Sequence, residues 1–582
     1  MNVDLRNIKS FPHQVEISGS NYFIVKETDG YYLVSSICPH QGGEIIYNNG
    51  FECKVHGWKF NNSGECINVP SQKLYRKKLN VNGEITKLAE ISNNFKTERT
   101  SDVDLDIKLH AHSCVEITHN GYSVLTDPWL EGLAFMGSWK HSPQPLVKAE
   151  QLDPNLIWIS HEHSDHFHIE TIKKFNRKTK ILFPDFPNKR IEKTLIDLGF
   201  EDILPLKFGE EKSIYGFKFT CYEPQSVWND SILHINVNNF NILNLNDAGL
   251  NFRIKKYLPK IDLLMSAFSP GASGFPLCWK NLSKKERIDY YVKAKNGMLE
   301  MLERACKLYD TDFLLPYASH FDLHIPEHSE YRALLVKHGK NTIMDVKDHI
   351  KGFEVLDILP GESWNSVSGR TYRIYNEKSK KAMYSRKMAQ HKEFEKYFPA
   401  KDPDVKMGLI EYLHNLNSIP EICLCEDIRV RLNSTYFTIE SGKLHVHAPI
   451  SECDLAIDIP ENILKSVILN NISWDEAHIG YWCTMYRKTD KFNQQFWRLL
   501  QSPYYKKKIK NRKPSDNIIS ESTNVLEIVN NYPNSEPILR RYGLYCFGCA
   551  NAIKEDIKQA ADYHGLDESS SKNLIMELNN AI

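Results

Sequence analysis

The chain has 582 residues, of which 41% are hydrophobic and 25% charged, as in ordinary globular proteins, and at roughly 150 residues per domain this length allows about four domains. Its 73 Lys and Arg balance its 73 Asp and Glu, so the bulk charge favours neither nucleic acid nor an anionic membrane as a partner. No segment approaches the ~20 apolar residues of a membrane span, residues 1–15 lack the apolar core of a signal peptide, and the 13 cysteines are too few for a disulfide framework. We therefore expect a cytoplasmic protein.

The predicted elements divide the chain into four domains, and the expected fold class is multidomain α+β. Residues 1–95 contain short aromatic and β-branched runs and predict a small all-β domain. Residues 100–365 alternate strands and helices and predict layered α/β structure. Residues 370–512 predict an α+β accessory domain, and residues 521–582 a small helical domain. The expected strands are 22–25, 31–34, 106–109, 122–125, 156–159, 180–183, 241–245 and 429–432, and the expected helices are 171–177 and 462–469.

A paired Cys and His motif lies in the first domain. It reads Cys38-Pro-His40-Gln-Gly-Gly, then, after His40 and twelve residues, Cys53-Lys-Val-His56-Gly-Trp. Two thiolates and two imidazoles are the ligands of a Rieske [2Fe–2S] cluster, in which each pair holds one iron. Structural zinc is the alternative, but a zinc finger carries its two His on a helix, which these surroundings do not resemble. The motif therefore predicts a [2Fe–2S] cluster, with Cys66 as a buried thiol outside it.

A second motif, His161-Glu-His163-Ser-Asp165-His166, follows the apolar strand 156–159. A strand that ends in this spacing places four ligating side chains in one loop at the edge of a sheet. His161 and His163 can share one metal, while Asp165 and His166 can serve a second metal or a substrate. Asn244-Leu-Asn-Asp247, at the end of the strand 241–245, resembles the place where proteins with this motif carry an Asp that can bridge two metals.

This motif and its flanks resemble the metallo-β-lactamase fold, and the predicted domain is of the αβ/βα type. Hydrolytic members usually add a His before the strand that leads to the Asp, but residues 222–230 contain none, and His234 is expected to pack inside the strand. His320 and His324 are later candidates. Two His and one carboxylate with open positions suit non-haem Fe(II), whereas a full two-zinc hydrolase site is not expected.

The combination of both motifs resembles the CMP-N-acetylneuraminate hydroxylase family. The similar stretches are 38–43, 125–130, 160–166, 271–276 and 473–480. The resemblance implies an O₂-dependent monooxygenase in which a ferredoxin, a cytochrome b5-like carrier or a reductase reduces the cluster. The cluster would then reduce a mononuclear non-haem iron, with zinc as the alternative metal, and the substrate would be an N-acyl sugar nucleotide or another nitrogen-containing small molecule.

The resemblance also implies roles for particular residues. His161, His163, Asp165 and His166 would form the core of the iron site, with Asp247 second, and Asp165 and Asp247 would be the catalytic carboxylates. The loop 271–276 would lie near the substrate, although an ordinary tight turn explains its glycines equally well. Ser473 is expected to be a helix N-cap, with Glu476 completing a capping box inside the accessory domain.

Cysteines near the C-terminal end form another pattern. Cys546-Phe-Gly-Cys549 resembles a small helical domain associated with redox disulfides and hybrid-cluster proteins. The pair can form a disulfide, bind a metal or cluster, or remain two thiols in a small core. Cys423 and Cys425 are expected to be structural.

Two other functions compete with the oxygenase. One is a metal-dependent hydrolase with a regulatory or structural Rieske domain, and the missing His in 222–230 argues against it. The other is a non-catalytic electron-transfer protein, and the motif at 161–166 argues against that.

Overall fold

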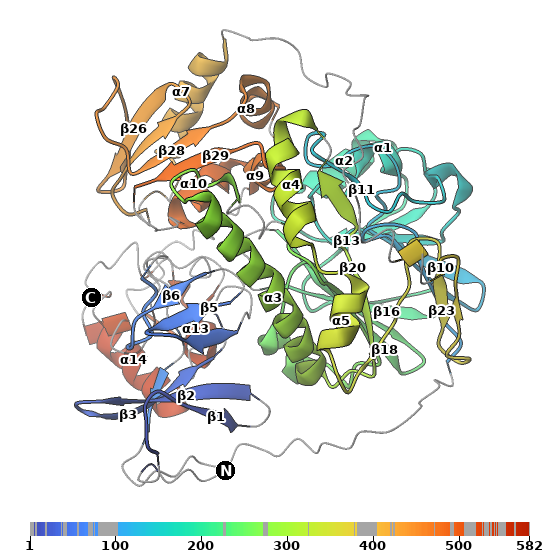
Figure 1. Cartoon of the computed structure of the whole chain (residues 1–582), viewed down its shortest axis with the longest axis horizontal. Helices are drawn as coiled ribbons and strands as arrows, with labels where there is room; N and C mark the ends of the chain where they lie inside the picture. The colour runs from blue at the N-terminus through green and yellow to red at the C-terminus, as the bar shows by residue number, and fades with distance from the viewer. Residues whose placement is uncertain are drawn as a thin grey trace. The chain divides into compact units, whose positions relative to one another are not determined.

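A computed structural model gives the fold (Figure 1). It describes residues 5, 8–17, 20–36, 38, 44–54, 57–67, 74, 76–79, 103–224, 229–271, 277–323, 325–376, 379–380, 404–419, 422, 425–470, 472–488, 494–505, 519–525, 528, 535, 538–539, 542, 544, 555–563 and 566–580. Among these residues, no helix combines the length and apolarity that crossing a bilayer requires.

The chain divides into two compact units that do not follow the predicted domain boundaries. The first unit contains Met1–Asn94, Leu409–Ala456 and Arg487–Ile582, and the second contains Phe95–Gly408 and Ile457–Tyr486. Residues 457–486, assigned by sequence to the accessory domain, thus group with the α/β domain. The division passes through α7 (Asp404–Leu416), β28 (Leu455–Asp458) and β29 (Thr484–Arg487).

Two sheets form the second unit. The first sheet has the order β14-β13-β12-β10-β9-β8-β23-β24, and the second has the order β15-β16-β17-β18-β19-β20-β22. The strands of the first sheet are β8 (Asp106–Leu109), β9 (Val115–His119), β10 (Tyr122–Thr126), β12 (Leu156–Trp158), β13 (Lys180–Pro184), β14 (Ile203–Leu206), β23 (Ser363–Asn365) and β24 (Thr371–Tyr372). Those of the second are β15 (Glu211–Ile214), β16 (Phe217–Tyr222), β17 (Ile232–Val237), β18 (Phe240–Asn246), β19 (Leu263–Ala267), β20 (Phe313–Tyr317) and β22 (Glu354–Val355).

Parallel pairing places the functional loops. Strands β10, β12, β13 and β14 are parallel in the first sheet, and β18, β19 and β20 are parallel in the second. Every residue of β12, β18, β19 and β20 is buried, as expected for parallel strands covered on both faces. Because parallel strands end at the same edge of a sheet, the segments after β10 and β12 lie together, as do those after β18, β19 and β20.

Helices and short elements complete the second unit. α3, α4 and α5 lie side by side, with α3 as the long green helix in Figure 1. The helices are α1 (Ile169–Ile172), α2 (Arg190–Asp197), α3 (Lys284–Tyr309), α4 (Ser329–His338), α5 (Ile343–His349), α8 (Glu461–Ile468) and α9 (Trp474–Ile479). The short elements are η2 (Ala149–Gln151), η3 (Phe252–Tyr257), η5 (Pro326–His328) and the paired strands β11 (Trp139–His141) and β21 (Phe321–Leu323).

The first unit contains antiparallel sheets and helices. One sheet has the order β1-β2-β3-β7, another has β4, β5 and β6, and a meander joins β25, β26 and β27. Its strands are β1 (His13–Ile17), β2 (Ser20–Glu27), β3 (Gly30–Ser35), β4 (Ile45–Tyr47), β5 (Phe51–Cys53), β6 (Lys59–Phe60), β7 (Arg76–Lys78), β25 (Ile428–Leu432), β26 (Thr435–Glu440) and β27 (Lys443–His447). Its helices are α10 (Gln494–Tyr505), α13 (Ile557–Tyr563) and α14 (Glu568–Asn580).

The predicted fold class is confirmed, and the predicted strands all fall on observed strands. The helix expected at 171–177 is wrong in extent, because α1 covers only Ile169–Ile172. His168 caps its start by accepting from the Thr171 amide, and the Arg177 guanidinium donates to the Lys173 and Phe175 carbonyls near its end. These side-chain contacts replace the backbone bonds of a longer helix.

The N-cap of α3 offers a test of local stability. The Ser283 hydroxyl accepts from the Glu286 amide, while the Glu286 carboxylate accepts from the Ser283 amide at 2.8 Å. Ser283→Ala should lower the free energy of unfolding of this unit by about 1 kcal/mol, as measured by denaturant titration. Lys285→Ala, at an exposed position of the same turn, should change it by less than about 0.5 kcal/mol. Equal effects of the two variants would contradict the capping role.

Candidate metal centre

The loop after β12 carries four potential ligands within six residues. It begins at Ser160, whose amide donates to Asp127 Oδ1 at 2.7 Å. Asp127 directly follows β10, which pairs in parallel with β12. This bond fixes the start of the loop against the neighbouring strand end, so that the side chains of residues 161–166 turn inward and are buried at His161, His163, Asp165 and His166.

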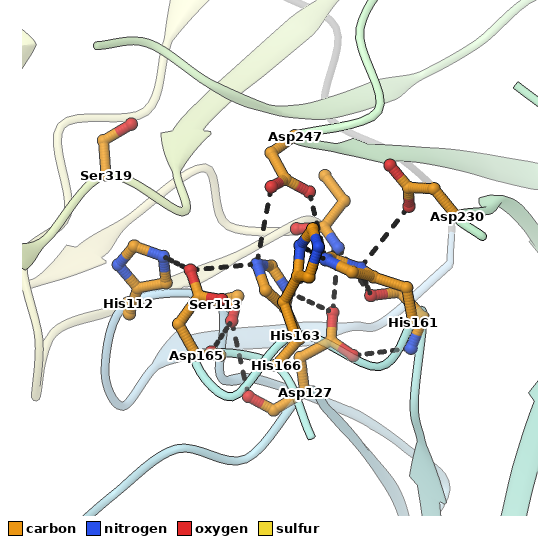
Figure 2. A network of polar contacts seen from close by, with 12 residues as sticks. His112, Ser113, Asp127, His161, His163, Asp165, His166, Asp230, Asp247 and Ser319 are labelled. Carbon is orange, nitrogen blue, oxygen red and sulfur yellow. Dashed lines mark hydrogen bonds and ion pairs between the residues drawn. The ribbon is translucent and has the colours of Figure 1, made fainter. Parts of the chain in front are cut away.

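One group of possible metal ligands contains His112, Asp165 and His166 (Figure 2). Asp165 Oδ2 lies 3.2 Å from His112 Nε2 and 3.4 Å from His166 Nε2. His112 comes from the turn between β8 and β9, and all three side chains are buried. We call this group the inner triad.

A second group contains His161, His163 and Asp247. His161 Nε2 lies 2.9 Å from His163 Nδ1 and 4.0 Å from Asp247 Oδ1. Asp247 follows β18 of the other sheet, so this group joins the edges of both sheets. We call it the outer triad, because the Asp247 side chain is 37% exposed while the other ligands of both triads are buried.

Asp247 links the two triads. Its Oδ1 faces His161, while its Oδ2 lies 3.8 Å from His166 Nε2 of the inner triad. Figure 2 shows the carboxylate between these two imidazoles, with His112 and Asp165 on one side and Asp230 on the other. One carboxylate that faces two sets of nitrogen ligands is suited to bridge two metal ions.

A hydrogen-bonded layer holds the ligands from behind. Asp127 Oδ2 lies 3.2 Å from His166 Nδ1, so the Nε2 atom of this ring faces the site. Asn246 Nδ2 donates to Asp127 Oδ2 at 3.1 Å and to Ser160 Oγ at 2.6 Å. Ser160 Oγ in turn lies 2.9 Å from His161 Nδ1. Such partners fix the ring orientation and the tautomer of metal-binding histidines.

Two further buried carboxylates contact the outer triad. Asp230, just before β17, lies 3.4 Å from His161 Nδ1 through its Oδ1. Asp475, in α9, lies 3.5 Å from His163 Nε2 through its Oδ2. The four imidazoles of the two triads therefore face five aspartates, namely Asp127, Asp165, Asp230, Asp247 and Asp475.

Burial and these charges shift the titration of the site. Burial raises the pKa of Asp165, but His166 and His112 outweigh it and hold the pKa well below its usual value. Burial lowers the pKa of His163, yet Asp475, Asp165 and Asp247 raise it to about 9. Burial, reinforced by Asp247, raises the pKa of Asp230 well above its usual value.

The donor set fits a metal. Each triad offers two imidazole nitrogens and one carboxylate oxygen within 4.8 Å of one another. Asp165 Oδ1 and His166 Nε2 are buried without a hydrogen-bond partner among the described residues, as expected of atoms that await a cation. Two His and one carboxylate with open positions form the ligand set of non-haem iron enzymes.

The predicted cluster ligands belong to the first unit. Cys38 and Cys53 are fully buried, and Cys53 ends β5. The Cys53 amide donates to the Trp58 carbonyl at 2.7 Å, and the Gly57 amide donates to the Cys53 carbonyl at 2.9 Å. Gly57 closes this turn with φ +65°, a conformation that favours glycine. His40 and His56 lie outside the described residues.

The other predicted residues lie apart from the triads. His320 is buried after β20 but belongs to neither triad, and His234 contacts Asn241 Oδ1 at 3.1 Å. Cys66 and Cys425 are buried, as expected. Several predicted residues lie outside the described residues, namely His324, Cys423, Cys546, Cys549 and 272–276. Gly271, at the start of that loop, is described, and an added Cβ there would lie 3.2 Å from Trp139 Cη2.

Sequence reasoning missed part of the site. His112 and Asp127 could have been found from the sequence, because each lies shortly after the end of a predicted strand, 106–109 and 122–125. Asp230 and Asp475 carry no comparable signal. The predicted capping box is also wrong: Ser473 does cap α9, but the Glu476 carboxylate accepts from the Ser164 amide at 2.8 Å and from the Ser164 hydroxyl at 2.7 Å.

Asp127→Ala tests the supporting layer. The change leaves the Ser160 amide and the Asn246 amide group without their shared acceptor in a buried site. We expect the free energy of unfolding to fall by about 3 kcal/mol in a denaturant titration, and metal affinity to fall roughly tenfold. Asp197→Asn, at an exposed position of α2, should change neither quantity measurably. A similar result for both variants would rule out the supporting role of Asp127.

Comparisons with known proteins identify the domains. Residues 2–81 match the Rieske [2Fe-2S] domain, residues 106–265 match a beta-lactamase superfamily domain, and residues 519–570 match a domain of unknown function, DUF1858. The predicted pairing of the first two domains is thus confirmed.

Curated relatives are similar over most of the chain. Cytidine monophosphate-N-acetylneuraminic acid hydroxylase of Danio rerio is 22% identical over 86% of this chain and 92% of that protein. The Mus musculus protein of the same name is 21% identical over 83% of this chain and 91% of that protein. A solved structure, the diiron beta-hydroxylase CmlA of Streptomyces venezuelae, aligns with 48% of this chain and 55% of that chain at 16% identity, with a TM-score of only 0.30. The chain therefore joins a Rieske [2Fe–2S] domain to a metallo-β-lactamase-fold domain and is similar over most of its length to the cytidine monophosphate-N-acetylneuraminic acid hydroxylases.

Proposed function

We propose that this protein is an O₂-dependent monooxygenase in which the Rieske cluster supplies electrons to non-haem iron held by the inner and outer triads. The observation that carries the proposal is that two sets of two His and one Asp share one site in a chain that also matches a Rieske domain. A cluster of this kind transfers single electrons, which hydrolysis does not need. The hydroxylase names of the full-length relatives support the same reaction class.

The ligand count favours two iron ions over the single ion expected from the sequence. His112, Asp165 and His166 would hold one ion, and His161, His163 and Asp247 the other, with Asp247 close to both. Iron bound there would supply O₂ activation, with two electrons passed one at a time from the external donor through the cluster. One oxygen atom would enter the substrate, and the other would leave as water after taking up the two electrons and two protons.

The residues of the chain prepare the site for this chemistry. Burial of the inner triad excludes water from that side, whereas the exposed part of Asp247 leaves the outer side open to a substrate. Asp127 holds His166 so that its Nε2 faces the site. Asp165 stays ionised because His112 and His166 lower its pKa, so it is ready to neutralise a cation.

The substrate class follows from the relatives. Their name gives a nucleotide-activated sialic acid as the molecule that those proteins hydroxylate. We propose an N-acyl sugar nucleotide or another nitrogen-containing small molecule for this chain, and a ferredoxin, a cytochrome b5-like carrier or a reductase as its electron donor. Loop 271–276 is the proposed substrate loop.

A metal-dependent hydrolase remains the second candidate function. Two triads with Asp247 close to both would also suit two zinc ions, which activate water between them. In that case the Rieske domain would be regulatory or structural, and turnover would consume no electrons from its cluster.

Metal analysis separates these functions. We measure iron, zinc and acid-labile sulfide in protein purified without oxygen. About four irons and two sulfides per chain would support a cluster plus two irons, and about three irons would support a cluster plus one. Two irons, two sulfides and one or two zincs would contradict the oxygenase and favour the hydrolase.

Two variants should separate the centres. His161→Ala should lower turnover about a thousandfold, because a catalytic metal supplies several kcal/mol, and it should leave the Rieske absorption and EPR spectra intact. Cys38→Ser should remove those spectra and donor-dependent turnover while the metal of the triads remains.

His234→Ala is the control, because this imidazole lies on β17 outside both triads. It should keep the spectra, the metal content and the turnover. Normal turnover in His161→Ala would refute the proposed site.

A further inference from the structure

The part of the chain around α9 lies more than 300 residues after the ligand loop but contacts it directly. Glu476 accepts two hydrogen bonds from Ser164, whose neighbours in sequence are His163 and Asp165. Asp475 faces His163 at 3.5 Å. Both acidic side chains are buried, at 1% and 8% exposure, in a position where an unpaired carboxylate would be costly.

Asp475 is placed where it can serve a metal-binding imidazole: its carboxylate lies at ion-pair distance from His163 Nε2, just beyond a hydrogen bond. His163 Nδ1 faces His161 Nε2 inside the outer triad, whereas Nε2 points away toward Asp475 Oδ2. A neutral imidazole that binds metal through Nδ1 carries its proton on Nε2, where a carboxylate can accept it. The Ser473 hydroxyl donates to the same Asp475 oxygen at 3.2 Å and fixes its position.

Glu476 acts on the backbone of the loop. Its two oxygens take the amide and the hydroxyl of Ser164, while the Ser164 hydroxyl oxygen accepts from the Phe135 amide at 2.7 Å. The Phe135 carbonyl accepts from Trp482 Nε1 at 3.0 Å. Gly480 allows this close packing, since an added Cβ would lie 3.0 Å from the backbone carbonyl oxygen of Phe135 and 2.5 Å from the backbone carbonyl oxygen of Glu476.

We propose that Asp475 and Glu476 are positioning residues of the outer triad: Asp475 sets the tautomer and orientation of His163, and Glu476 fixes the loop at Ser164. This inference rests on the proposed metal site. It assigns to residues 473–482 a role in metal binding, although the ligands themselves lie elsewhere in the chain.

The test is a titration with Co²⁺ of full-length protein that retains its Rieske cluster but has lost the triad metals to a chelator, followed by the change in visible absorption relative to the cluster alone and by chelator competition. In wild type we expect two bound ions. Asp475→Ala should weaken one of them roughly 10- to 100-fold and change its absorption bands, while the other keeps its affinity. Asp475→Asn, which keeps an acceptor oxygen of the same size, should weaken that ion less than Asp475→Ala does.

Controls distinguish positioning from folding. Asp357→Asn removes a buried carboxylate that pairs with Lys380 at 2.9 Å in the same unit, and it should lower thermal stability without changing either Co²⁺ affinity. Equal Co²⁺ affinities in wild type and in both Asp475 variants would overturn the inference. If Asp475→Ala does not fold, Asp475→Asn decides by the same criterion.

The same titration separates this inference from the proposed function. Failure of wild type to bind Co²⁺ at imidazole ligands would refute the metal site itself, and the inference with it. Normal binding by wild type together with unchanged binding by the Asp475 variants would refute only the role of Asp475.

Discussion

Asp127 is the residue on which the geometry of the candidate site depends. Its two oxygens receive the Ser160 amide, which starts the ligand loop, and face His166 Nδ1 and the Asn246 side chain from the other sheet. One carboxylate at the end of β10 therefore connects the loop after β12 to the end of β18. Burial raises the pKa of this carboxyl, while His166 and the hydrogen bonds from Ser160 oppose that shift and favour the ionised form. The placement of the ligands follows from this connection, since both loops begin at it.

Local sequence patterns predict the parts of the site that lie on one strand and its following loop. His161, His163, Asp165 and His166 could be predicted because spacing within one loop survives folding, and Asp247 because its place after a predicted strand resembles that of a metal-bridging Asp in the metallo-β-lactamase fold. The cluster cysteines could be predicted from their spacing in the same way. The fold class could be predicted as well, because strand-like and helical segments alternate along residues 100–365.

The remaining members of the site depend on contacts that no local pattern encodes. Asp475 reads as a helix residue after a capping serine, and only the fold brings it to His163. Glu476 shows why the capping-box rule failed here. The rule pairs the carboxylate with the N-cap amide of its own helix, but the Glu476 carboxylate accepts instead from two donors on Ser164, which lies far away in the sequence. Asp230 lies in a stretch, 222–230, that contains no histidine, so a search for imidazole ligands gave no signal there.

The two triads are not equivalent, and the difference bears on where chemistry would occur. The inner triad is closed on all sides by protein, and its Asp165 is paired with two imidazoles, which suits an ion that is held firmly and exchanges little. The outer triad contains the only ligand that is substantially exposed, Asp247, among the described residues of both groups. A substrate could therefore approach a metal held by the outer triad, and Asp247, which lies 3.8 Å from His166 Nε2, would place its charge close to both metals. A metal in the outer triad would therefore contact the substrate, and a metal in the inner triad would set the charge and geometry of the pair. This division would account for the two further buried carboxylates, Asp230 and Asp475, that lie behind the outer histidines.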